Sequence, residues 1–170
     1  MADDRATRLR HYARRFRLRS LVETGTYMGD MVWAMRRQFD EIYSVELDAK
    51  LHARAVERFK SNPHIHLYQG DSAKVLGDVI PRLNGPSLFW LDGHYSAGVT
   101  AKGESETPVM SEIGHVLDDS RWAHVILVDD ARCFGQGEYP AVDDLRTLIA
   151  TRRDLALEVT EDVIRILPKQ

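Results

Sequence analysis

Cysteine is nearly absent from this sequence, because Cys133 is the only one among 170 residues. A single thiol cannot form a disulfide within the chain, and it excludes a zinc site built from four cysteines. Long apolar runs are lacking too: no segment approaches the about 20 apolar residues that cross a bilayer, and the first residues lack the apolar core of a signal peptide. We therefore expect a cytoplasmic protein with no membrane contact.

The sequence also lacks a strong excess of charge of either sign. Its formal net charge is -3 at pH 7, so we do not expect nucleic acid as a partner. Seven arginines nevertheless occur between Arg5 and Arg19, in a segment with apolar residues at helical spacing. These apolar residues are Leu9, Tyr12, Ala13 and Phe16. The arginines are either a contact for an anionic partner or the solvated face of a helix, and we favour the solvated face because charge runs are usually solvated.

The length of the chain suits one domain with a substantial core and is too short for two ordinary domains. Hydrophobic residues make up 44% of the sequence and charged residues 29%, which is typical of globular proteins. We expect residues 1–170 to form a single domain, with a basic helix over residues 1–19 and an α/β core over residues 20–170.

Short apolar segments rich in β-branched residues alternate with segments whose apolar residues recur every three or four positions, which is typical of βαβ units. The predicted strands are residues 20–23, 41–46, 65–68, 87–92, 124–129, 155–159 and 163–167. Asp48 is expected to cap one helix, and Pro108 and Pro140 to be the first residues of two others. Only residues 160–162 separate the last two strands, which predicts an antiparallel hairpin at one side of a mainly parallel sheet.

A glycine loop follows the first predicted strand, in residues 23–29. Glycines allow the backbone to turn sharply and to approach a ligand closely. This loop has Gly25 and Gly29 and begins at the carboxylate of Glu23, whereas a dinucleotide-binding loop has three glycines around a pyrophosphate. Because Glu23 would repel an anion, a cationic amino-acid tail suits this position better.

Carboxylates also occur where the second and third predicted strands end. Glu46 is placed to accept hydrogen bonds from both hydroxyls of a ribose, and Asp71 to accept one from an exocyclic amine. Each of them alone could simply be a strand-end or helix-cap residue. Together with Glu23 they occupy matching places in successive units, which predicts a ligand that carries ammonium, ribose and adenine groups.

Four short motifs follow one another along the chain. They are Glu23-x-Gly25-x-x-x-Gly29, Val45-Glu46, Gly70-Asp71 and Leu91-Asp92. Their order resembles that of the class I S-adenosylmethionine-dependent methyltransferases, over the chain from about residue 18 to the C-terminal hairpin. The resemblance implies a Rossmann-like three-layer sandwich with seven strands, and an enzyme that transfers the methyl group of S-adenosylmethionine. The cofactor-binding residues that we infer are Glu23, Gly25, Thr26, Tyr27, Gly29, Glu46, Asp71, Ser72 and Asp92. Tyr27 departs from the family pattern, which often has a third glycine there.

A second acidic group consists of Asp92, Asp129 and Asp130. In the implied topology the fourth and fifth strands are neighbours, so their ends bring these three carboxylates together. Like charges so close are costly without a cation, and carboxylate oxygens suit Mg²⁺ or Mn²⁺. The arrangement resembles the metal-dependent sugar O-methyltransferases of the macrocin O-methyltransferase type, in which equivalent aspartates hold a divalent ion at the acceptor hydroxyl. We expect Asp92 or His94 to accept the hydroxyl proton.

Other interpretations of these residues stay open. Asp92 could be a structural residue at a strand end, with Asp129 and Asp130 capping the next loop and His94 facing solvent. Residues 125–130 also resemble the strand and paired acids of phosphoribosyltransferases, although residues 131–134 are bulky where that family has a small loop. A non-catalytic nucleoside-binding domain is a third class. For the methyltransferase, we expect a small hydroxylated acceptor, such as a sugar or natural product, and a homodimer whose partner completes the pocket.

Overall fold

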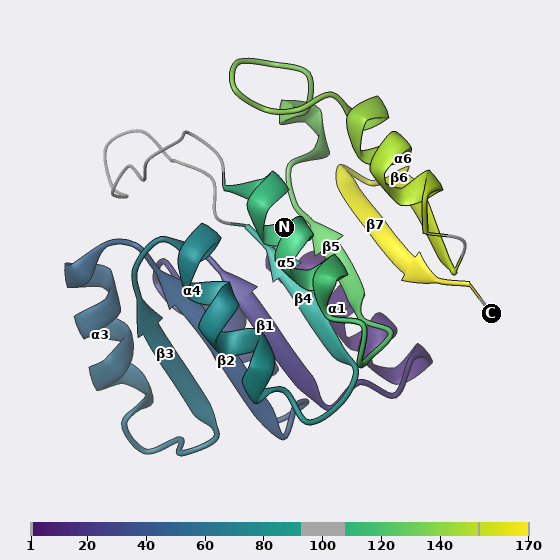
Figure 1. The fold of residues 1–170 in the computed structure, drawn as a ribbon. Helices are drawn as coiled ribbons and strands as arrows, with labels where there is room; N and C mark the ends of the chain where they lie inside the picture. Colours follow the sequence, from purple (N-terminus) through teal and green to yellow (C-terminus); the bar gives the residue numbers. More distant parts are fainter. Residues whose placement is uncertain (1, 93–107, 153, 170) are drawn as a thin grey trace.

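The computed structural model of the chain describes residues 2–92, 108–152 and 154–169. They form one sheet with helices on both faces (Figure 1). In chain order the elements are α1 (Ala2–Arg15), β1 (Ser20–Thr24), α2 (Asp30–Met35), β2 (Glu41–Glu46), α3 (Ala49–Phe59), β3 (Ile65–Gln69), α4 (Ser72–Val79), the 3-10 helix η1 (Ile80–Arg82), β4 (Ser87–Leu91), α5 (Val109–Asp118), β5 (Val125–Val128), the 3-10 helix η2 (Ala131–Cys133), α6 (Val142–Ala150), β6 (Leu155–Thr160) and β7 (Val163–Pro168).

The order of the strands across the sheet is β3-β2-β1-β4-β5-β7-β6. The first five strands in this order pair in parallel, and β7 runs antiparallel to both β5 and β6. This confirms the predicted seven-stranded, mostly parallel sheet with an antiparallel C-terminal hairpin. From β1 the chain adds β2 and β3 on one side, and it then returns to add β4 on the other side of β1. Ligands of open α/β sheets bind beside the carboxyl ends of the strands at such a switch point.

Two apolar cores, one on each face of the sheet, make the protein a three-layer sandwich. Alternate residues of a strand point to opposite faces, so Leu21 of β1 packs with α1, α2 and α3, whereas Val22 packs with α4, α5 and α6. In β4, Trp90 belongs to the first core and Leu91 to the second. In Figure 1, α4 and α5 lie in front of the sheet and α1 behind it.

The predicted strands agree with the observed ones to within one residue at each end. Asp48 caps α3 as predicted, because its carboxylate accepts hydrogen bonds from the N–H groups of Lys50 and Leu51. The predicted starts of two helices are wrong. Pro108 is the residue before α5, and Pro140 lies two residues before α6, which begins after Ala141 because the Ala141 N–H donates to the Asp144 carboxylate at 2.9 Å.

The basic N-terminal helix is shorter than the predicted residues 1–19, since α1 ends at Arg15. The chain leaves the helix through Arg17, whose φ of 54° is left-handed. The Leu18 N–H donates to the Ala13 carbonyl at 2.8 Å, and the Arg17 N–H donates to the Arg14 carbonyl at 3.3 Å. This is the Schellman arrangement that ends many helices, here with arginine in the position usually held by glycine.

The C-terminal hairpin turns through Glu161 and Asp162, which both have positive φ angles of 52° and 61°. Two such residues between antiparallel strands are the pattern of a type I′ turn, whose twist matches that of the strands. The short link that predicted the hairpin therefore forms the tight turn expected for it.

Among the residues that the structure describes, no helix combines the length and the apolar character that crossing a bilayer would require.

Two glycines make a matched test of this fold. Gly29 is the N-cap residue before α2 and has a φ of 78°. A Cβ added there would lie 2.8 Å from Phe59 Cε2, whereas a Cβ on Gly114 within α5 would meet nothing within 4 Å. We expect Gly29→Ala to lower the free energy of unfolding by about 1–3 kcal/mol. Gly114→Ala should raise it by about 0.5–1 kcal/mol, because alanine favours a helix interior. Urea unfolding of both variants measures this, and equal effects would contradict the loop geometry.

Candidate functional site

The candidate site lies where the parallel strands end. The register pairs Glu23 of β1 with Ser44 of β2, and Glu46 of β2 with Gln69 of β3. The ends of these strands therefore meet at one edge of the sheet, as the sequence predicts for Glu23, Glu46 and Asp71. Because side chains alternate along a strand, Glu23, Ser44 and Glu46 point to the face that α1, α2 and α3 cover.

Glu46 connects the glycine loop to the end of β2. The Tyr27 N–H donates to its Oε2 at 2.7 Å, and the Asp48 N–H donates to its Oε1 at 2.9 Å. The side chain is buried. Each carboxylate oxygen can accept a further hydrogen bond, so this geometry leaves acceptor capacity for a pair of ligand hydroxyls.

Tyr27 occupies the position at which the sequence departs from the family pattern. Its φ of 49° is left-handed, a conformation that glycine adopts without strain and that costs a non-glycine residue about 1 kcal/mol. The hydrogen bond from its N–H to Glu46 offsets part of that cost. Its side chain is exposed, and Gly25 in the same loop also has a positive φ, of 84°. The loop thus has the backbone shape of a glycine loop although one of its residues is tyrosine.

Glu23 lies beneath this loop and is 2% exposed. The Ser44 hydroxyl donates to Glu23 Oε2 at 2.5 Å, and the hydroxyls of Thr26 and Ser44 are 2.6 Å apart. Burial raises the pKa of Glu23 to about 8, although the Ser44 hydrogen bond lowers it in part. The carboxyl is therefore mainly neutral at pH 7, and a cationic group close to it would favour the charged form. Its direct contact with a ligand ammonium stays a prediction.

Asp71 and Ser72 lie at the start of α4. Asp71 is the N-cap of this helix and accepts a hydrogen bond from the Ala73 N–H at 3.0 Å, which is the helix-cap role considered for it from sequence. The neighbouring Gly70 N–H donates to the Glu46 carbonyl at 2.9 Å. This bond fixes the start of α4 beside the end of β2. The predicted contact of Asp71 with an exocyclic amine stays a prediction.

Glu112 of α5 is a buried acid that the sequence analysis missed. It is 1% exposed, and its polar neighbours are the hydroxyls of Ser72 and Thr24. Burial raises the pKa of Glu112 to about 7, and the nearby hydroxyls of Ser72 and Thr24 offset part of this effect. The sequence does contain a signal for it, because Glu112 falls at helical spacing among Val109 and Ile113 on an otherwise apolar stripe.

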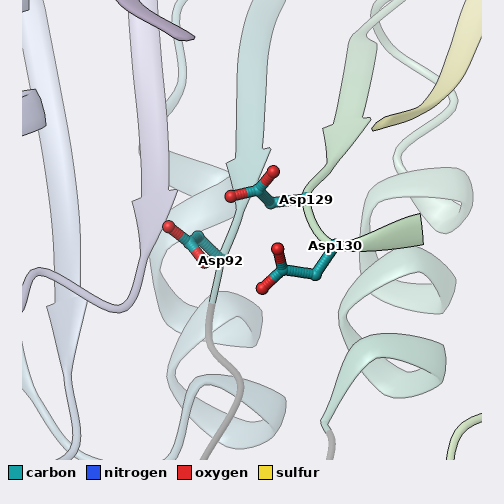
Figure 2. A group of neighbouring side chains, drawn as sticks. All are labelled: Asp92, Asp129 and Asp130. Carbon is teal, nitrogen blue, oxygen red and sulfur yellow. The ribbon is translucent and has the colours of Figure 1, made fainter. Parts of the chain in front are cut away.

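The acidic cluster consists of Asp92, Asp129 and Asp130, and one carboxylate oxygen of each lies within 4.8 Å of the others. Figure 2 shows the three side chains gathered where β4 and β5 end. The Asp129 N–H donates to the Leu91 carbonyl at 3.0 Å, which extends the pairing of these strands. The predicted meeting of the three carboxylates is therefore confirmed. Burial raises the pKa of Asp129 to about 6, and repulsion from Asp92 and Asp130 contributes.

Arg5 of α1 lies against this acidic cluster. Its Nη2 is 2.6 Å from Asp129 Oδ2 and 3.7 Å from Asp130 Oδ1, and its Nη1 is 3.8 Å from Asp92 Oδ2. The interpretation of the arginine segment as a solvated helix face is wrong for this residue. Arg5 precedes Leu9 by four positions, so it continues the buried stripe of the helix by one turn.

His94 lies in residues 93–107, which are outside the described part of the chain. The structure therefore leaves its predicted role as a proton acceptor untested.

Comparison with solved structures places this fold among methyltransferases. The O-methyltransferase from Bacillus cereus, in complex with SAH, is 18% identical, with a TM-score of 0.71 over 98% of this chain and 81% of that one. TomG, an O-methyltransferase from Streptomyces achromogenes involved in tomaymycin synthesis and solved with SAM, is 16% identical, with a TM-score of 0.69 over 98% and 80%. The 23S rRNA methyltransferase ErmE is 14% identical, with a TM-score of 0.63 over 98% and 68%.

No family model matches the sequence, and a search of curated proteins gives no significant match. At these identities the likeness shows the fold alone. The chain has the Rossmann-like, three-layer fold that these methyltransferases share.

The raised pKa of Glu112 predicts how its replacement changes stability with pH. A carboxyl whose pKa is higher in the folded state stabilises the fold fully below its unfolded pKa, and this contribution is lost as the pH rises through about 7. Glu112→Gln cannot ionise. We therefore expect its free energy of unfolding, relative to the natural protein, to rise by about 1–3 kcal/mol between pH 5 and pH 8.

Urea unfolding at both pH values measures this difference. Glu57→Gln is the control, because Glu57 is exposed and pairs with Lys60 at the surface. Parallel pH profiles for Glu112→Gln and the natural protein would contradict the raised pKa of this buried carboxyl.

Proposed function

We propose that this protein transfers the methyl group of S-adenosylmethionine to a hydroxyl group of a small molecule. The observation that carries the proposal is Glu46, a buried carboxylate at the end of β2 that the glycine loop holds in place through the Tyr27 N–H. A carboxylate at this position of an open α/β sheet accepts the hydroxyls of a ribose. The fold shared with methyltransferases supports the same assignment.

The other groups at this edge of the sheet fit the remaining parts of the cofactor. Asp71 has acceptor oxygens for an exocyclic amine beside its helix cap, and Glu23 offers a carboxyl to a cationic amino-acid tail. Gly25, Thr26 and Gly29 belong to the loop over which the ligand would lie. The Asp92 N–H donates to the Thr24 carbonyl before this loop at 3.2 Å, and Ser72 begins α4 next to Asp71. When bound, S-adenosylmethionine supplies an electrophilic methyl group on a sulfonium.

The acidic cluster fits a divalent cation. It offers carboxylate oxygens only, two of its members are almost fully buried, and burial together with repulsion from its neighbours raises the pKa of Asp129. Mg²⁺ and Mn²⁺ favour such oxygen ligands. We therefore propose that Asp92, Asp129 and Asp130 hold Mg²⁺ or Mn²⁺, which would polarise the acceptor hydroxyl and lower its pKa.

Asp92 is the member of the cluster best placed to exchange a proton with the acceptor. Its side chain is 22% exposed, whereas that of Asp129 is 4% exposed. It also follows β4 directly at the point where the chain reverses its progress across the sheet. We assign Asp92 as the group that accepts the hydroxyl proton, with His94 as the other candidate.

A small acceptor such as a sugar or natural product is favoured over nucleic acid. The net charge of -3 gives no general attraction to nucleic acid, and several arginines of the N-terminal segment are already paired with acids: Arg5 with Asp129, Arg8 with Glu161 and Arg19 with Asp40. The names of two structural neighbours as O-methyltransferases agree with a hydroxyl acceptor. ErmE, in contrast, shows that this fold also occurs in an rRNA methyltransferase. We also propose that the protein is cytoplasmic and forms a homodimer.

Two alternative functions would require different residues at this site. A phosphoribosyltransferase would hold a diphosphate beside Asp129 and Asp130, but the bulky residues after them form η2, where Arg132 pairs with Asp130 at 2.7 Å. A non-catalytic nucleoside-binding domain would retain Glu46 without turnover. Glu46 and the acidic cluster together favour the methyltransferase.

Calorimetric titration with S-adenosylhomocysteine tests the cofactor site. Glu46→Gln keeps the size of the side chain but removes its charge, and charged hydrogen bonds contribute about 1.5–3 kcal/mol. We expect the affinity to fall by a factor of about 10–100. Glu41→Gln is the control, because Glu41 begins the same strand and pairs with His66 at the surface.

Titration with phosphoribosyl diphosphate in parallel distinguishes the alternatives. The proposal would be wrong if the natural protein bound that ligand and not S-adenosylhomocysteine. Unchanged affinity in folded Glu46→Gln would remove the assignment of the ribose site.

Removal of the metal tests the second half of the proposal. We expect a chelator in excess, or Asp129→Asn, to lower turnover by at least about 100-fold, because the acceptor hydroxyl then lacks its Lewis acid. Binding of S-adenosylhomocysteine should change by less than about threefold, since the ribose and adenine contacts stay intact. Methyl transfer from labelled S-adenosylmethionine to candidate sugars gives the readout. Full turnover in the chelator would contradict a catalytic metal.

A further inference from the structure

The acidic cluster already has a cation beside it, and that cation belongs to the chain. The Arg5 guanidinium lies within 4 Å of all three carboxylates, nearest to Asp129 Oδ2. We propose that Arg5 and a divalent cation are alternative partners of Asp92, Asp129 and Asp130, so that Arg5 must leave the cluster for the ion to bind. This inference rests on the metal site of the proposed function.

The short distances between Arg5 and the carboxylates make it unfavourable for the guanidinium and a divalent ion to occupy the cluster together. Arg5 Nη2 is 2.6 Å from Asp129 Oδ2, an oxygen buried from solvent. A Mg²⁺ ion would have to approach its ligand oxygens to about 2.1 Å. The ion and the guanidinium would then stand a few ångströms apart, where their like charges repel each other strongly. One of the two cations therefore excludes the other.

The charge of the cluster leads to the same conclusion. Arg132 Nη1 lies 2.7 Å from Asp130 Oδ1, and this arginine also pairs with Asp162. With Arg5 and Arg132 both in place, guanidinium groups offset part of the negative charge of the three carboxylates. A divalent ion binds strongly only where the negative charge is largely free, so the release of Arg5 restores the charge that the ion needs.

Arg5 can leave without disturbing the core. Ala6, Leu9 and Tyr12 fix α1 against the sheet, and they stay buried whatever the Arg5 side chain does. The Arg5 side chain is 41% exposed, so a change of rotamer would carry its guanidinium into solvent. Arg8, one turn later, pairs with Asp4 and with Glu161 of the hairpin and keeps this part of the helix in place. The exchange is local, because only one long side chain has to move.

This arrangement would give the site two states. Without an ion, Arg5 relieves the repulsion among the three carboxylates and keeps them together. With an ion, the guanidinium is released into solvent beside the site, where it can meet an anionic group of a ligand. By linkage, any anion that captures Arg5 would strengthen metal binding by the same factor as the metal strengthens anion binding.

Binding of Mn²⁺, measured by the electron paramagnetic resonance signal of the free ion, tests this proposal without any use of turnover. The full chain is compared with Arg5→Gln, which retains a polar side chain, and with Arg5→Lys, which retains the charge. Arg14→Gln is the matched control, because it removes the same charge from an exposed position of α1. Thermal unfolding and S-adenosylhomocysteine binding establish that each variant is folded.

We expect Arg5→Gln to bind Mn²⁺ at least about tenfold more tightly than the natural protein, with Arg5→Lys between the two. Arg14→Gln should stay within about twofold of the natural protein, because solvent and salt screen its charge. Equal Mn²⁺ affinity in the natural protein and in Arg5→Gln would overturn the competition and leave the metal site standing. Weaker binding in Arg5→Gln would overturn it as well. Absence of Mn²⁺ binding in every folded variant would overturn the metal site itself.

Discussion

Parallel pairing of β1 with β2 and β4 is the constraint on which the rest of this site depends. Strands that run in the same direction end at the same edge of the sheet, and here each of these ends carries or precedes an acid. Glu46 closes β2, Asp92 follows β4, and Glu23 lies one residue before the end of β1. The pairing places these carboxyl groups on one face, beneath α1 and the glycine loop. The parallel pairing therefore brings several carboxyl groups close together, and their negative charges repel one another.

The structure reduces this repulsion in several physically different ways. Burial raises the pKa of Glu23 to about 8 and that of Glu112 to about 7, so that Glu23 is mainly neutral and Glu112 partly neutral at pH 7, with hydroxyl groups as their neighbours. Backbone N–H groups hold Glu46, which is also buried. The acidic cluster instead has a guanidinium, that of Arg5, against Asp129. In the proposed function, a cationic ligand group or a metal ion would replace some of these partners of the carboxyl groups. The carboxyl groups that are stabilised within the protein alone are therefore also the groups that bind the ligand.

The fold could be predicted from the sequence because its signals are local. Apolar periodicity located the seven strands, and the capping carboxylate of Asp48 located the start of α3. The meeting of Asp92 with Asp129 is predicted by the strand order that the resemblance to methyltransferases implies, and not by a local signal. Arg5 and Glu112 were not predicted, since their environment depends on which helix covers which strand end. A run of arginines gives no sign of which member pairs with acids from another part of the chain, so the expectation of a solvated helix face is wrong for Arg5.

A crystal structure of the protein with S-adenosylhomocysteine tests the central claim most directly, because it locates each part of the ligand against a named side chain. The account predicts both ribose hydroxyls on the Glu46 carboxylate, the adenine beside Asp71, and the sulfur facing Asp92. The Glu46 carboxylate would keep its hydrogen bonds from Tyr27 and Asp48. A ligand bound away from Glu46, with the ribose hydroxyls on other residues, would contradict the account.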